Sequence, residues 1–78
     1  MKITTIKAFI ATDASGDEGV CGFMKPDGQW LPMVCADDAR VDSLRPLAEK
    51  IAKATGKIIT LSRFSVREDL EVFGGKAN

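Results

Sequence analysis

The chain has 78 residues, of which 45% are hydrophobic and 28% charged, and its 11 basic and 11 acidic side chains cancel to zero net charge. This length indicates a single small domain that buries about 60–65% of the surface exposed by the unfolded chain. No apolar run approaches the roughly 20 residues of a membrane-spanning helix, and the N-terminal segment lacks the uninterrupted apolar core of a secretory signal. We therefore expect a cytoplasmic protein that has no membrane partner.

The first predicted element is a strand over residues 3–12, because β-forming residues alternate there between two faces. One face carries Ile6, Ala8 and Ile10, and the other carries Thr5, Lys7, Phe9 and Ala11. Residues 13–19 are rich in Asp, Ser and Gly and are predicted to form a loop. Because this loop leads directly into the next apolar segment, we expect the first two strands to pair antiparallel.

The segment from Gly19 to Cys35 is predicted to form a β-hairpin. The turn signal is Pro26-Asp27-Gly28, in which Pro presets φ and Gly takes a left-handed position. A three-residue loop with a glycine bulge places Lys25 opposite Gln29. The pairs that follow along the two strands are Met24 with Trp30, Phe23 with Leu31, and Val20 with Val34.

Both faces of this hairpin are apolar in sequence. One face carries Cys21, Phe23, Leu31, Met33 and Cys35, and the other carries Val20, Gly22, Met24, Trp30, Pro32 and Val34. A sheet with two apolar faces needs a cover on each side. Since a proline cannot donate a ladder hydrogen bond, Pro32 predicts that the second strand of the hairpin lies at a sheet edge.

The two cysteines are predicted to be reduced and buried. In the expected register Cys21 and Cys35 form a diagonal pair that is too offset for easy bridging. A cytoplasmic location also favours free thiols. We therefore interpret both side chains as small hydrophobic core residues.

A helical region is predicted to begin at Asp37 and Asp38, where acidic groups favour a helix start. Pro46 lies within it, so we expect a short first turn followed by a main helix from about Ser43. An apolar stripe along this helix would cover one face of the sheet, and Gly56 would end it. The stripe consists of Leu44, Leu47, Ala48, Ile51 and Thr55.

Residues 57–64 are predicted to form a fourth strand, and Ser65 to Glu68 resembles a capping box that starts a short last helix through Phe73. A crossover through the main helix would lay the fourth strand parallel to the first. The predicted fold class is therefore α+β: a three-stranded antiparallel meander, a helix, a fourth strand in the order 3-2-1-4, and a short C-terminal helix. Residues 1–73 would form this βββαβα domain and residues 74–78 a flexible tail.

No catalytic or metal-binding pattern emerges from the sequence. Asp13, Ser15 and Asp17 resemble the start of a calcium loop, but Glu18 and Met24 stand where such a loop needs Gly and Glu. There is no histidine to activate a cysteine or to complete a zinc site. We expect a protein that is not an enzyme and that uses no cofactor and no metal.

The runs FIATD, PDGQWLPMVCAD, LRPLAEKIAKATGK and RFSVREDL together resemble small uncharacterised proteins of bacteria and their phages or mobile elements. In size and general character the chain is also similar to phage-borne inhibitors of host systems, including anti-CRISPR proteins. This resemblance implies a regulator or inhibitor and brings no functional residues with it.

The residues that we expect to contact a partner fall into two groups. Met24, Trp30 and Val34 would share the sheet face that the main helix leaves open, where Trp and Met are typical of interface centres. The acidic group is Asp13, Asp17 and Glu18, within a stretch from residue 13 to 42 that holds seven acidic and two basic side chains.

The predicted function is that of a non-enzymatic protein-binding module, with another protein or a second copy in a homodimer as the partner. Three alternatives remain open at this point. Trp30 could instead pack under the last helix against Leu70 and Phe73 as ordinary core. The chain could be a structural homodimeric protein, or it could bind nucleic acid through a basic helix face, although zero net charge argues against the last. That face consists of Arg45, Lys50, Lys53 and Lys57.

Overall fold

The computed structural model describes residues 2–75 and contains one helix and a set of short and long strands. The α+β class is confirmed, and every strand pairing in the described residues is antiparallel. In chain order the elements are β1 (Ile6–Thr12), β2 (Glu18–Val20), β3 (Gly22–Met24), β4 (Trp30–Pro32), β5 (Val34–Cys35), α1 (Asp38–Thr55) and β6 (Ile58–Phe64).

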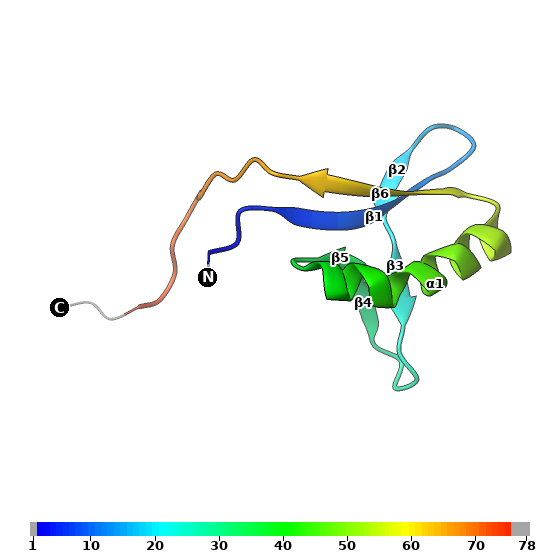
Figure 1. Cartoon of the computed structure of the whole chain (residues 1–78), viewed down its shortest axis with the longest axis horizontal. Helices are drawn as coiled ribbons and strands as arrows, with labels where there is room; N and C mark the ends of the chain where they lie inside the picture. The colour runs from blue at the N-terminus through cyan, green and yellow to red at the C-terminus, as the bar shows by residue number, and fades with distance from the viewer. Residues whose placement is uncertain (1, 76–78) are drawn as a thin grey trace.

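Strand β1 is the centre of the main sheet (Figure 1). Along one edge it pairs with β6 over its full length, from Ile6 opposite Phe64 to Thr12 opposite Ile58. Along its other edge it pairs with β2 near its C-terminal end and with β5 near its N-terminal end. The sheet therefore has β6 at one side and two short strands at the other.

Three backbone hydrogen bonds explain how two short strands share one edge of β1. The N–H of Phe9 donates to the carbonyl oxygen of Met33 over 3.1 Å, and the carbonyl oxygen of Phe9 accepts from the N–H of Cys21 over 2.8 Å. The N–H of Met33 donates to the carbonyl oxygen of Cys21, also over 2.8 Å. Strands β2 and β5 are therefore two halves of one partner of β1, and the hairpin of β3 and β4 leaves the sheet between them (Figure 1).

The hairpin itself has the predicted register. Phe23 lies opposite Leu31 and Met24 opposite Trp30. Gly28 has φ of 89°, and the N–H of Lys25 donates to the carbonyl oxygen of Gln29 over 2.8 Å. The prediction was wrong beyond this point, because Val20 pairs with Ile10 and Val34 pairs with Ala8 rather than with each other.

The predicted strand order 3-2-1-4 and the parallel fourth strand were also wrong. Strand β6 runs antiparallel to β1. The reason is that β5, which leads into α1, itself runs antiparallel to β1. The crossover through α1 lays β6 parallel to β5, as expected of a strand–helix–strand unit, and so antiparallel to β1.

Helix α1 is continuous from Asp38 to Thr55, so the prediction of a separate first turn before Ser43 was wrong. Its N-cap is Asp37, whose Oδ1 accepts from the N–H of Arg40 over 2.8 Å, and its C-cap Gly56 has φ of 72°. Pro46 lies inside the helix. Buried residues on both sides of the proline hold the two halves against the sheet, which offsets the one missing hydrogen bond.

The core lies between α1 and one face of the sheet. It includes the predicted free thiols, because Cys21 and Cys35 are both reduced and buried, and burial raises the pKa of each thiol above its ordinary value. The buried core cluster consists of Phe9, Cys21, Met33, Cys35, Val41, Leu44 and Ala48. The opposite face of the sheet is left uncovered by α1.

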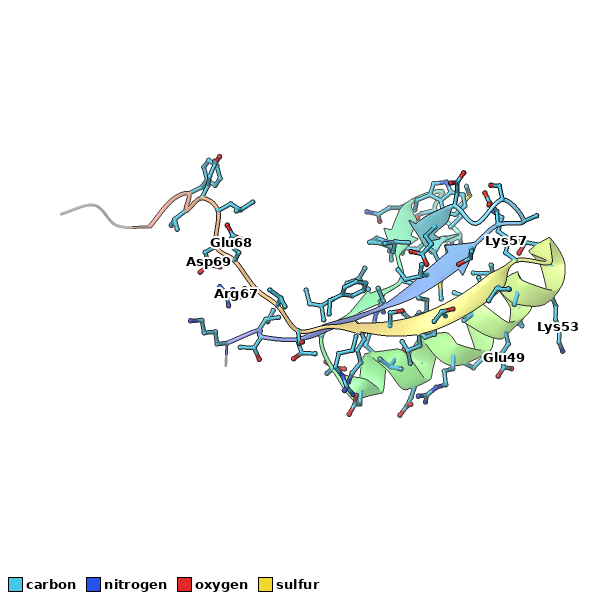
Figure 2. The ribbon with its side chains drawn as sticks, turned by 90° about the horizontal axis from the view of Figure 1, so that it is seen from above. Glu49, Lys53, Lys57, Arg67, Glu68 and Asp69 are labelled. Atoms are coloured by element: carbon cyan, nitrogen blue, oxygen red, sulfur yellow. The ribbon has the colours of Figure 1, made fainter. Side chains whose placement is uncertain are left out.

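The predicted C-terminal helix is absent from the described residues. After Phe64 the chain runs away from the sheet without regular structure (Figure 1), and Leu70 and Phe73 are 80% and 84% exposed. A capping box contributes only about 1 kcal/mol, and a short helix without an apolar partner surface is not stable in water. The side chain of Arg67 contacts Asp69 and the carbonyl oxygen of Ile3 instead (Figure 2). Of the predicted flexible tail, residues 76–78 lie outside the described residues.

A candidate protein-binding surface beside Trp30

Trp30 lies on β4 and is 63% exposed, although it is the largest apolar side chain in the protein. Its indole ring lies close to Gly22 of β3, where a Cβ atom would stand 3.5 Å from the ring. This is ordinary van der Waals contact, so one side of the ring packs on the hairpin beside Gly22 and the rest of the ring is exposed. The alternative that Trp30 packs beneath a last helix against Leu70 and Phe73 is wrong, because neither the helix nor the burial is found.

A groove of about 460 Å³ runs from Trp30 to the C-terminal end of α1. We call it the Trp30 groove. Strand β2 and the start of β3 form one part of its lining, and the last turns of α1 form another. The residues that define it are Ala11, Asp13, Asp17, Glu18, Gly19, Val20, Cys21, Gly22, Trp30, Ile51, Thr55 and Lys57.

The loop from Asp13 to Glu18, the acidic loop, has a defined internal structure. Oδ1 of Asp13 accepts from the N–H of Ser15 over 2.9 Å, from Oγ of Ser15 over 2.6 Å and from the N–H of Asp17 over 3.0 Å. The hydroxyl of Ser15 is the main reason that the pKa of Asp13 is lowered, followed by the N–H of Asp17. Asp13 therefore shapes the loop, and the carboxylates of Asp17 and Glu18 remain exposed for contacts with another molecule.

The structure brings together four of the six predicted partner-binding residues. Trp30, Asp13, Asp17 and Glu18 all line the Trp30 groove. Met24 is exposed on the hairpin opposite Trp30 but does not line the groove, and Val34 lies beside Ala8 on the main sheet. The expected single face of Met24, Trp30 and Val34 is divided because the hairpin leaves the sheet at Cys21 and Met33.

Eight groove residues were not among the predicted partner contacts, and three of them lie at or just after the C-terminal end of α1. Ile51 and Thr55 were assigned to the buried stripe of the helix, and Lys57 to its basic face. The signal that was overlooked is the polar Thr55 at the end of an otherwise apolar stripe, next to the Gly56 cap. A polar residue there indicates that the stripe reaches solvent at the last turn, where the groove begins.

The basic helix face is less continuous than its sequence indicates. Arg45 forms an ion pair with Asp42, one turn before it. The acidic side chain of Glu49 lies between the basic ones, and Glu49 and Lys53 both extend away from α1 (Figure 2). Phosphate recognition uses several unopposed cations on one surface, and on this helix face Arg45 is already paired with Asp42.

Within residues 2–75 no group of three side chains from His, Cys, Asp and Glu is arranged to hold a metal ion. The same part of the chain contains no helix that is both long and apolar enough to cross a bilayer. No family model, curated protein or solved structure matches the chain.

Proposed function

We propose that this protein is a non-enzymatic protein-binding module that acts as a regulator or inhibitor of its partner. The observation that carries the proposal is the presence of a largely exposed tryptophan in the same groove as two exposed carboxylates, those of Asp17 and Glu18. Large exposed aromatic residues are enriched among the residues that dominate binding energy in protein interfaces.

The chemistry of the groove favours a basic side chain of the partner. An arginine or lysine lying on the face of an indole ring gains about 0.5–2 kcal/mol from the cation–π interaction. In this groove its charged end would approach Asp17 and Glu18, while Ile51 and Val20 offer apolar contacts for the stem. The groove carries three carboxylates against the single cation of Lys57, so its net charge is complementary to such a side chain.

The proposal is tested by capturing partners from an extract of the native host with the tagged full-length chain. Trp30→Ala and the double reversal of Asp17→Lys with Glu18→Lys are compared with the wild type. The control is Glu71→Lys, which changes charge in the exposed tail beyond Phe64, at the opposite end of the sheet from the acidic loop. Asp13 is not reversed because its carboxylate holds the loop together.

We expect the wild type and the Glu71→Lys control to capture the same protein, and both groove variants to bind the purified partner at least about tenfold more weakly. The affinity should also fall as salt is raised, because exposed charges are screened. Unchanged affinity of both groove variants would remove the groove from the binding site. Binding that survives Trp30→Ala but is lost in Lys50→Glu with Lys53→Glu would assign the contact to the basic helix face.

A further inference from the structure

The outer edge of β6 offers a row of unpaired backbone groups. In β1 the N–H and C=O of Phe9 point toward β2 and β5, so the neighbouring residues of β1 point their backbone groups toward β6. In the observed register these are bonded to Ile58, Thr60, Ser62 and Phe64. The N–H and C=O groups of the alternate residues of β6, Ile59, Leu61 and Arg63, therefore point outward, and no described segment pairs with them.

This edge lacks the usual protection against strand pairing. Natural sheet edges are shielded by short strands, prolines, bulges or several charges. Strand β6 has seven residues, no proline and a single charge, at Arg63. The opposite edge of the sheet is formed by two short strands that are separated by the projecting hairpin.

We propose that β6 pairs antiparallel with β6 of a second copy, about a two-fold axis that passes beside Leu61. In this register Leu61 lies opposite Leu61 of the second copy, and Ile59 lies opposite Arg63 of the second copy. All the outward N–H and C=O groups of the three residues then find partners. The two sheets form one continuous sheet across the pairing.

The side chains on the uncovered face support this register. Ile58 is 69% exposed and Phe64 is 53% exposed, and both lie on the sheet face opposite α1 because they alternate with Leu61, which pairs with the buried Phe9. The two-fold axis places each Ile58 opposite Phe64 of the second copy. Two pairs of exposed apolar side chains are thereby brought together, and aromatic–aliphatic cross-strand pairs are stabilising.

The charges also fit a second copy of this chain. Arg63 would face Ile59 of the second copy, so the only charged residue of β6 does not meet itself. On the α1 side, Arg45 and Glu49 both line a groove of about 200 Å³ with Leu61. The two-fold axis makes the two copies of α1 antiparallel. Arg45 of one copy and Glu49 of the other therefore lie toward the same end of the paired strands, so opposite charges face each other.

This dimer and the proposed function use different surfaces. The residues that define the Trp30 groove do not include any part of β6. A dimer formed through β6 would leave both grooves free for a partner. Loss of one activity in a variant therefore does not imply loss of the other.

Sedimentation equilibrium of the full-length chain tests the pairing. We expect the wild type to dimerise, and Ile58→Lys or Phe64→Glu alone to weaken dimerisation at least about tenfold. The double variant should recover dimerisation, because the new charges lie opposite each other across the two-fold axis. The matched control is Val72→Lys in the exposed tail. This control and the separate variant Trp30→Ala should each dimerise like the wild type.

Hydrogen exchange gives an independent readout. The amides of Ile59, Leu61 and Arg63 should exchange rapidly in dilute protein and become protected as the concentration rises, whereas those of Thr60 and Ser62 should be protected throughout. A wild type that stays monomeric at high concentration would overturn the proposal. So would a dimer that is unaffected by both single substitutions, one that the double variant fails to restore, or one that dissociates in Trp30→Ala.

Discussion

The backbone N–H of Met33 donates to the carbonyl oxygen of Cys21 over 2.8 Å, and this bond closes the base of the projecting hairpin. Both residues also bond to Phe9, so the central strand, the hairpin and the two short edge strands meet at one buried point. The position of Trp30 depends on this junction, because it directs the hairpin out of the sheet.

The two methionines Met33 and Met24 should therefore respond very differently to substitution. Met33 is fully buried, so Met33→Ala should lower the free energy of unfolding by about 2–5 kcal/mol through lost packing and a new cavity. Met24 is exposed, and Met24→Ala should change the free energy of unfolding by less than about 0.5 kcal/mol. Urea unfolding of both variants measures the difference. Equal effects would show that the junction does not stabilise the fold.

The locally encoded parts of the fold were predictable from the sequence. The turn at Pro26 to Gly28 and the caps at Asp37 and Gly56 depend on a few neighbouring residues, and the structure has all three. The strand over residues 57–64 was also predicted. These features require only the intrinsic preferences of Pro, Gly and Asp and the alternation of apolar residues.

The remaining errors concern competition between distant segments. Whether Val34 pairs with Val20 or with Ala8 cannot be decided from alternation, because both choices satisfy the apolar pattern of the hairpin. That one choice reverses the direction of the strand before α1, and with it the direction of β6. The last helix was mispredicted for a related reason, since a capping box is a local signal and Leu70 has no surface to pack against. Trp30 and the acidic residues of the loop were identified as candidate contacts from the sequence. That they line the same groove could be seen only from the strand topology of the structure.

Pro46 should be a destabilising residue in its present position. It interrupts the hydrogen bonds of α1 in the helix interior, where proline costs about 3 kcal/mol relative to alanine. We expect Pro46→Ala to raise the free energy of unfolding by about 1–3 kcal/mol, since part of the strain is relieved by the surrounding residues. Thermal unfolding followed by circular dichroism measures the change. A lower melting temperature would mean that the proline ring makes contacts that α1 requires.

The acidic loop should lose its structure in acid. Because the pKa of Asp13 is lowered in the folded protein, its stabilising contribution is complete above the ordinary aspartate pKa and is lost as the pH falls through the lowered value. The variant Ser15→Ala removes the largest cause, so the pKa of Asp13 should rise toward its ordinary value. NMR titration of the Asp13 carboxyl group in the wild type and in Ser15→Ala tests this expectation. An unchanged Asp13 titration would contradict the role of the hydroxyl.

The residues after Ser65 should contribute little to stability. Val66, Leu70 and Phe73 are all largely exposed, and a hydrogen bond from Arg67 to the carbonyl oxygen of Ile3 joins this segment to the residues before β1. A chain shortened to residues 1–65 should unfold within about 1 kcal/mol of the full-length chain. Urea unfolding of the two chains makes the comparison. A larger loss would show that the segment packs on the sheet in solution.

The claim that the protein presents Trp30 to a partner has a direct optical test, because Trp30 is the only tryptophan in the chain. We predict that its fluorescence in the free protein has the emission of a solvated indole and is fully quenched by iodide, at concentrations both below and above those that favour self-association. The captured partner should then shift the emission to the blue and protect it from iodide. A blue-shifted, iodide-resistant emission in the free protein would contradict the account, because it would place Trp30 in the core or in a self-association surface.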